Sequence, residues 1–429
     1  MPRVFLGGVT DMLTLFDCLD VFTVQSNNWD VSSSFTDLSR YNAAQPTAQQ
    51  RTDFTATVTA MLNIDGNCSS VTVPTSISSI YAIRTFRDTS KNTDFCVFYE
   101  KTSRQSFIST RREYEKGWGI FVVPKTVRQV SRFIHLSAPH PKWDSGTPQQ
   151  AAYLFANSGA KSLLVDGRHR WAISTQSTCI SAGNHSLTDP THDNKEVFHS
   201  ASQVIHNWLR TLALSQVDVR LSKFMERLQI LVVDLVGLST RVSLSRKFPR
   251  KSIPAVAVHN HLLHANTTIY TIHLSSNTKI KATASLEVPL STRPIPLPRP
   301  TALPITSLEF GAGSGGVNMP INDTVCDLAA FTNVFGRIVN GVSNEPANNE
   351  CVTAATDTSA LNRNRFVHAE QSPAMRTLSP DSCPSTGCAG AFRSINTNWP
   401  AWNTALKKAF AATCVGGVPT DSGSLLCPP

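Results

Sequence analysis

The chain has 429 residues, 41% of them hydrophobic and 16% charged, which is enough apolar material for a large buried core. The formal net charge of +9 is concentrated in residues 209–252, where nine Lys and Arg face three Asp and Glu, a local excess of +6. The rest of the chain is close to neutral, which argues against a nucleic-acid-binding protein that is basic throughout. No stretch is apolar for long enough to span a membrane.

Cysteines and sequons bear on the compartment. The ten cysteines are widely spaced and lack the Cys-x-x-Cys pairs of zinc ribbons. Four Asn-x-Ser/Thr sequons occur, at Asn67, Asn184, Asn266 and Asn322. Both features favour a secreted, disulfide-bearing protein. The N-terminal stretch favours the opposite, because Asp11, Asp17 and Asp20 interrupt its apolar run and make it a poor signal peptide.

The N-terminal part of the chain is polar. Ser, Thr, Asn and Gln are frequent over residues 25–60, and we therefore expect residues 1–59 to be poorly ordered. Cys68 and Cys96 bracket the following part and can form a disulfide across it. Apolar patterns predict buried strands at 78–86, 94–102 and 118–126.

A strand–helix–strand unit follows. Residues 132–138 and 161–167 have the composition of buried strands. Between them, Thr147-Pro148-Gln149-Gln150 predicts a helix start, with Thr147 as N-cap and Gln150 completing a capping box, and Gly159 suits the C-terminal cap. Such a βαβ unit implies a parallel strand pair with a right-handed crossover.

The remaining elements complete an α/β pattern. We expect helices at 194–212 and 402–413, and strands at 253–265, 269–276 and 365–370. The prediction is one α/β domain over residues 60–412, with a mixed, mainly parallel sheet and helices on both faces. It carries a basic insertion at 209–252, a Pro-rich crossing at 288–304 and a C-terminal tail at 413–429.

Polar side chains cluster where the predicted strands end. In open α/β sheets, ligands bind beyond the carboxyl ends of the strands. Four predicted strands deliver imidazole, carboxylate or guanidinium groups there: His140 and Asp144, then Arg168, His169 and Arg170, then His259 and His261, then His368 and Glu370. Asp189 and His192, in the loop TDPTHD, can line the same site.

Metal-assisted hydrolysis is the chemistry that fits this set. A catalytic zinc takes three nitrogen or oxygen ligands and binds a water in its fourth position. We expect His140, Asp144 and His259 to bind Zn²⁺ and Glu370 to act as general base. Arg168, Arg170, Arg376 and His169 are the candidates for binding the substrate, since a guanidinium holds a carboxylate through two hydrogen bonds.

Three segments resemble a known family. SAPHPKWDSGTPQQAAYLFANSGAKSLLV (137–165) is similar to the first metal motif of zinc-carboxypeptidase-like amidohydrolases, which include poly-γ-glutamate hydrolases and N-formylglutamate amidohydrolases. VAVHNH (256–261) and FVHAEQSPAMR (366–376) resemble that family's third metal-binding His and its late strand with a catalytic Glu and a following Arg. The resemblance implies a carboxypeptidase-like fold and hydrolysis of an amide bond in a small acidic or γ-glutamyl substrate. One departure is that the family's His-Gly element is His259-Asn260 here.

Two other functions stay open. The chain can be a catalytically inactive secreted or structural homologue on the same fold. It can instead be a nucleic-acid-associated protein that uses the basic segment 246–252, RKFPRKS, which would give binding with a steep salt dependence.

Overall fold

The structure is a computed structural model that describes residues 9–30, 38–180, 183–208, 270–275, 332–339, 342, 349–353, 366–370, 396 and 398–409. The chain divides into two units, residues 1–206 with 269–429 and residues 207–268, and nearly all of the described residues belong to the first unit. The predicted insertion, the Pro-rich crossing, the C-terminal tail and the strand at 253–265 lie outside the described residues.

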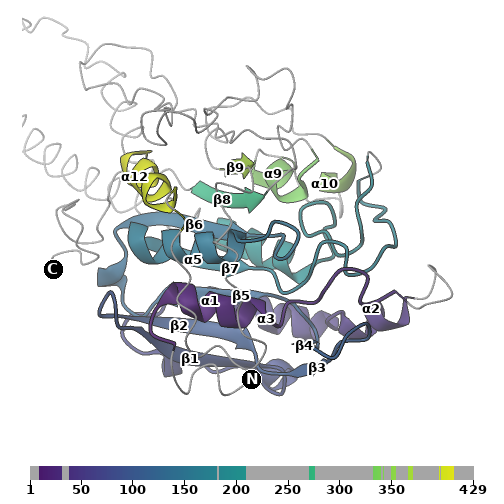
Figure 1. The fold of residues 1–429 in the computed structure, drawn as a ribbon, viewed down its shortest axis with the longest axis horizontal. Helices are drawn as coiled ribbons and strands as arrows, with labels where there is room; N and C mark the ends of the chain where they lie inside the picture. The colour runs from purple at the N-terminus through teal and green to yellow at the C-terminus, as the bar shows by residue number, and fades with distance from the viewer. Residues whose placement is uncertain are drawn as a thin grey trace, which may run out of the picture. The chain divides into compact units, whose positions relative to one another are not determined.

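Helices and strands follow one another along the chain as Figure 1 labels them. The helices are α1 (Met12–Asp20), α2 (Ser39–Ala44), α3 (Ala48–Leu62), α4 (Thr75–Ser78), α5 (Thr147–Ser158), α9 (Val334–Val339), α10 (Asn349–Val352) and α12 (Trp399–Ala409), with 3-10 turns at Cys68–Ser70 and Val127–Gln129 and a further helical segment at 197–208. The strands are β1 (Tyr81–Asp88), β2 (Thr93–Glu100), β3 (Ser103–Gln105), β4 (Arg112–Tyr114), β5 (Ile120–Pro124), β6 (Arg132–Ala138), β7 (Ala160–Val165), β8 (Tyr270–Ser275) and β9 (Phe366–Glu370).

Seven of the strands form one mixed sheet, in the order β1-β2-β5-β7-β6-β8-β9. The pairs β1–β2, β2–β5 and β5–β7 are antiparallel, whereas β7–β6, β6–β8 and β8–β9 are parallel. The α/β class is therefore confirmed, but a mainly parallel sheet is not. Only residues 89–92 join β1 to β2, and so short a connection produces an antiparallel pair.

The predicted βαβ unit is present as β6–α5–β7, with β6 and β7 parallel. Gly159 ends α5 in the left-handed conformation, as expected, with φ of 70°. The predicted N-cap was wrong by one residue: Gly146 occupies that position and Thr147 is the first helical residue. The Thr147 hydroxyl donates to the carbonyl oxygen of Asp144 at 2.8 Å, so no capping box forms there.

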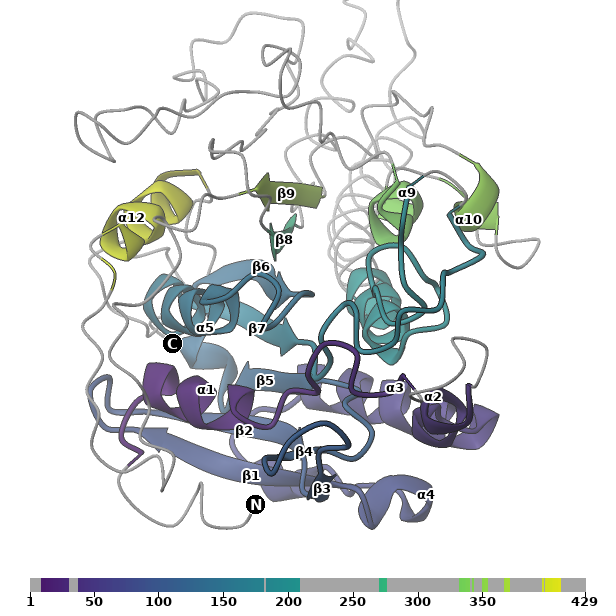
Figure 2. The ribbon, with the colours of Figure 1, turned by 45° about the vertical axis from the view of Figure 1, so that its right-hand side comes forward.

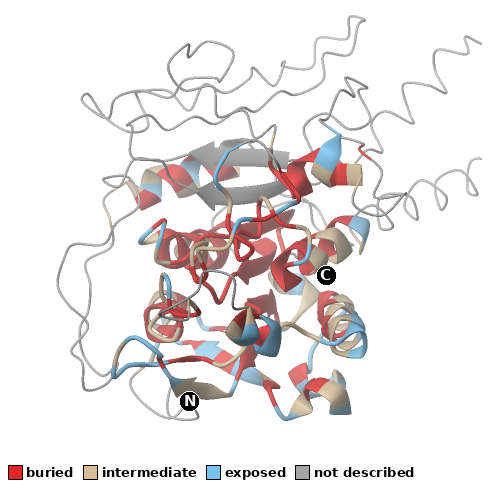
Figure 3. Cartoon of the chain, turned by 90° about the vertical axis from the view of Figure 1, so that its right-hand side faces the viewer, coloured by how far each residue is buried: buried red, intermediate tan, exposed pale blue. Residues whose placement is uncertain are grey.

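Helices cover both faces of the sheet. Phe95, Val97 and Tyr99 alternate along β2 and lie in the same apolar core as residues of α1 and α5. Phe98 points to the other face, where its ring lies 5.0 Å from that of Phe54 on α3. Figure 2 shows α1, α5 and α12 on one side of the sheet and α3 on the other, and Figure 3 shows that the central strands between them are buried.

The N-terminal segment is more ordered than its polarity predicted, because it contains α1, α2 and the greater part of α3. Met12, Leu15, Phe16 and Leu19 of α1 recur at helical spacing and are all buried in the core. Burying side chains of this size stabilises the fold by about 1.5–3 kcal/mol each relative to exposure. The expected disorder of residues 1–59 was therefore wrong for the described part of that segment, residues 9–30 and 38–59.

Candidate functional site

The loop after β6 brings His140 and Asp144 together. The Asp144 N–H donates to the His140 carbonyl oxygen at 2.8 Å, closing a single helical turn. This turn places the His140 Nδ1 3.2 Å from Asp144 Oδ2, with both side chains buried. Lys142 adopts a positive φ of 66°, and its ammonium lies 2.8 Å from Asp20 of α1. An ion pair to the core helix therefore anchors the loop.

A second loop, residues 183–193, supplies a carboxylate to the other side of the same imidazole. The His140 Nε2 lies 3.0 Å from Asp189 Oδ1 and 3.1 Å from the Thr191 hydroxyl. Asp189 is fully buried, and a turn in which the Asp193 N–H donates to the Asp189 carbonyl oxygen at 2.8 Å holds it in place. His140 thus lies between two buried carboxylates.

Asp189 is the centre of the cluster. Its Oδ2 contacts Arg170, lies 3.0 Å from the Nδ1 of His192 and lies 3.6 Å from the Nδ1 of His185. The imidazole rings of His185 and His192 are stacked, with centroids 3.6 Å apart and an interplanar angle of 6°. The Nε2 of His192 lies 3.1 Å from the Thr332 hydroxyl, next to α9.

The charges of these groups follow from their neighbours. Burial and Arg170 lower the pKa of His140, but Asp189 and Asp144 outweigh them and raise it to about 9. Burial alone would raise the pKa of Asp189, but Arg170, His192 and His140 hold it well below the usual range. Burial lowers the pKa of His192 to about 4 in spite of Asp189. At neutral pH the metal-free cluster therefore combines a charged His140, an ionised Asp189 and a neutral His192.

The predicted substrate-binding residues Arg168, His169 and Arg170 follow β7, and the structure gives them different surroundings. Arg168 is fully buried, and one of its guanidinium nitrogens lies 2.8 and 2.7 Å from the two carboxylate oxygens of Glu196. Gly117 and Gly167 pack backbone to backbone beside it, and a Cβ on Gly167 would lie 2.8 Å from the Gly117 Cα. Arg168 therefore has a structural role: its described hydrogen bonds go to Glu196 and to the carbonyl oxygens of Lys116 and Ala44.

The two following residues do reach the cluster. Arg170 pairs with Asp189, and its guanidinium carbon lies 5.6 Å from the centre of the Trp143 ring. The His169 ring meets Trp143 edge to face at 5.7 Å, and its Nδ1 accepts from the Trp171 N–H at 2.9 Å. Trp143 is 46% exposed, although it lies between the buried residues His140 and Asp144 in the sequence. An exposed indole and a cation thus stand beside the buried acids.

For three predicted residues the structure describes the backbone alone or nothing. Glu370 is the last residue of β9, and because β6, β8 and β9 are parallel, its backbone lies at the sheet edge that His140 follows. His259 and Arg376 lie outside the described residues. Whether His259 completes a site with His140 and Asp144 stays a prediction.

The structure adds residues that the sequence did not single out strongly. Among the described residues, the three whose ligand atoms all lie within 4.8 Å of one another, as a metal site requires, are His185, Asp189 and His192. Their spacing of four and three residues was a signal in the sequence, but the contact between Asp189 and His140 spans 49 residues and depends on the fold.

Comparisons with protein-family models, curated proteins and solved structures found no match. The evidence for a function therefore comes from the residues of the site itself. In the part of the chain that the structure describes, no helix has the length and apolarity needed to cross a bilayer.

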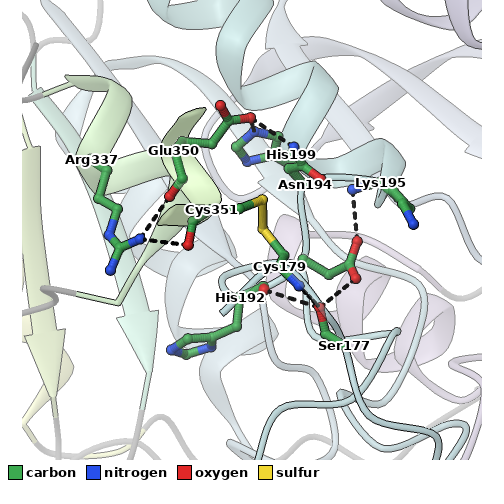
Figure 4. Close-up of a disulfide and its surroundings, with 10 residues drawn as sticks. Ser177, Cys179, His192, Asn194, Lys195, His199, Arg337, Glu350 and Cys351 are labelled. Atoms are coloured by element: carbon green, nitrogen blue, oxygen red, sulfur yellow. Dashed lines mark hydrogen bonds and ion pairs between the residues drawn. A yellow bond between two sulfur atoms is a disulfide. The ribbon is translucent and has the colours of Figure 1, made fainter. Parts of the chain in front are cut away.

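A disulfide ties the segment that precedes the second loop to α10 in the C-terminal part of the chain. Figure 4 shows Cys179 bonded to Cys351 of α10, with Ser177 beside it. The Ser177 hydroxyl accepts from the Cys179 N–H at 3.1 Å and donates to Asp193 at 2.6 Å. The predicted disulfide between Cys68 and Cys96 is also present, remote in sequence from the cluster.

Proposed function

We propose that the chain is a zinc-dependent hydrolase that cleaves an amide bond in a small acidic substrate, such as a γ-glutamyl or N-acyl amino acid. The observation that supports it most is the buried His140–Asp144 pair, with the Asp189 carboxylate behind the imidazole. Zinc-binding histidines usually donate their other ring N–H to a carboxylate, and Asp189 is placed to accept it from His140 Nε2 at 3.0 Å.

His140 Nδ1 and Asp144 would hold the metal in this proposal, and His259 would be the third ligand. When bound, zinc lowers the pKa of a coordinated water to about 7 and polarises a carbonyl group. With the metal bound, Asp189 would accept the Nε2–H of His140 and leave the Nδ1 lone pair for the metal. Glu370, at the same edge of the sheet, would take the proton from the attacking water.

Arg170 and Trp143 would determine which substrates this site prefers. Arg170 contacts Asp189 and its side chain is 15% exposed, so the exposed part of its guanidinium would bind a substrate carboxylate. The exposed face of Trp143 offers an apolar surface next to it. A substrate with a carboxylate and an acyl or alkyl part fits this pair of groups.

The test is hydrolysis by the zinc-loaded chain of matched amides with and without a carboxylate, followed by amine release. Glu370→Gln is expected to keep its zinc and lose activity by about 10²–10⁴-fold. Arg170→Met is expected to raise KM for the acidic amides and not for neutral ones. Arg87→Met, an exposed arginine on β1, is the control and should change neither. Equal rates for wild type and Glu370→Gln would overturn the proposal.

A further inference from the structure

We propose that His185, Asp189 and His192 form a second cation site, separate from the one assigned to His140 and Asp144. It does not depend on the proposed reaction, because it uses its own pair of imidazoles. The two sites share only Asp189, which would bind the second cation through Oδ2 while its Oδ1 accepts from His140.

Asp189 has more polar neighbours than its carboxylate has lone pairs to bind. Five polar groups lie within hydrogen-bond distance of its two oxygens: His140 Nε2, the Thr191 N–H and the Thr191 hydroxyl at Oδ1, and Arg170 and His192 Nδ1 at Oδ2. A sixth, His185 Nδ1, lies 3.6 Å from Oδ2. A carboxylate offers about four lone-pair positions. A cation on Oδ2 relieves this excess, because the two imidazoles then present lone pairs to the metal and no longer compete as donors.

The distances between the imidazole nitrogens and the Asp189 carboxylate also suit a shared cation. Two ligands that are each about 2.1 Å from a tetrahedral zinc lie roughly 3.4 Å apart. The Nδ1 atoms of His192 and His185 lie 3.0 and 3.6 Å from Asp189 Oδ2, on either side of that value. Forming the site therefore needs shifts of a few tenths of an ångström in these distances and a rotation of the stacked rings, because a metal bound through Nδ1 lies in the plane of each imidazole.

The surroundings of the two imidazole rings also favour a cation. The Thr332 hydroxyl, 3.1 Å from His192 Nε2, can accept that N–H and leave the Nδ1 lone pair facing Asp189 and the Thr191 hydroxyl, which lies 2.8 Å from Nδ1. Gly183, with φ of 90°, is close to the His185 ring, and a Cβ there would lie 3.0 Å from its Nε2. The backbone thus passes His185 where only glycine fits without displacing the ring.

The ligand set indicates which cation. Two imidazoles and one carboxylate suit zinc and similar transition metals, whereas magnesium and calcium prefer oxygen ligands alone. The side chains of both histidines are 14% exposed, which leaves a route for an ion to enter from solvent and keep a water ligand. The site would take Zn²⁺, and Co²⁺ is its spectroscopic substitute.

The experiment is titration of the metal-free full chain with Co²⁺ and Zn²⁺, followed by visible absorption and calorimetry. His192→Gln and His185→Gln are expected to lose one equivalent, with affinity falling at least about 100-fold. His135→Gln, a buried histidine of β6 whose Nδ1 pairs with the Ser162 hydroxyl and which belongs to neither proposed site, is the matched control and should bind as wild type does. Circular dichroism and thermal unfolding verify that each variant is folded.

The outcomes separate this inference from the proposed function. Two equivalents in wild type, one lost in His192→Gln and the other in His140→Ala, support both. A single equivalent that is lost in His192→Gln and kept in His140→Ala supports the second site and overturns the first. A single equivalent lost only in His140→Ala, or lost in both variants as one shared site, overturns the second site, and so does a wild type that binds no metal.

Discussion

His140 is the residue on which the account depends most, because two buried carboxylates flank it. Its pKa is raised to about 9 from an ordinary 6.5 by Asp189 and Asp144, against the opposing effects of burial and Arg170. A raised pKa stabilises the folded state fully below pH 6.5, and this contribution disappears as the pH rises through 9.

We therefore expect the metal-free protein to lose up to about 3 kcal/mol of unfolding free energy between pH 6.5 and 9, since each pKa unit corresponds to about 1.4 kcal/mol. Urea unfolding across this range measures it. His140→Gln removes the titrating group and should give a flatter profile. Parallel profiles for the two proteins would show that His140 is not charged between these carboxylates.

Arg168 gives a second residue-scale prediction. Its ion pair with Glu196 is completely enclosed, so Glu196→Gln leaves a buried charge without its counter-ion. We expect a loss of about 3 kcal/mol or more in urea unfolding. The exposed pair of Arg87 and Asp94 is the control, and Asp94→Asn should cost less than about 1 kcal/mol. A small effect of Glu196→Gln would contradict the structural role given to Arg168.

Residue types alone predicted part of this site. His140 and Asp144 are four residues apart, and a local turn is enough to bring them together. Arg168 and Arg170 look equivalent in sequence, yet one is enclosed by Glu196 and the other contacts Asp189. That difference depends on which loop packs behind each strand end, which no local pattern encodes.

At the scale of elements, the same capping rule succeeds once and fails once. Thr47 and Gln50 form a full capping box at the start of α3, a signal present in the polar segment that was expected to be disordered. Thr147 and Gln150 have the same spacing and form none, because α5 begins one residue earlier, with Gly146 at the N-cap. Capping patterns locate a helix start to within a residue, and the preceding loop decides the rest.

The two disulfides of the described residues allow a matched test of the second loop. Replacing Cys179 and Cys351 by Ser removes the covalent link beside the 183–193 loop, and we expect zinc affinity to fall about tenfold or more. Replacing Cys68 and Cys96 opens a 28-residue separation instead and should cost about 3–4 kcal/mol of unfolding free energy without changing zinc affinity. Calorimetry and urea unfolding of both variants measure this. Equal zinc affinity in the two variants would show that the Cys179–Cys351 link does not position the loop.

At the scale of the whole molecule, the sheet is divided between two kinds of pairing. The half from β1 to β7 is antiparallel and the half from β7 to β9 is parallel. The candidate site follows β6 and β7 in the parallel half, where strand ends align at one edge. The sequence predicted the strands of both halves, but pairing direction depends on which strands become neighbours, and β5–β7 is an example that chain order does not reveal.

The basic segment at 246–252 lies outside the described residues, and it carries the nucleic-acid alternative. Replacing its four Lys and Arg by Ala should leave zinc content and amide hydrolysis unchanged. The measurements are elemental analysis and the amide assay on the variant. Tight, steeply salt-dependent binding of duplex DNA by wild type, lost in the variant, would favour the alternative.

The measurement that tests the central claim most directly is the zinc content of the purified, zinc-supplemented chain by elemental analysis, for wild type and for His140→Ala. The account predicts about two zinc ions per wild-type chain and about one in the variant. Zinc content that is the same in both proteins, or no zinc in wild type, would contradict the assignment of His140 as a metal ligand and with it the proposed hydrolase.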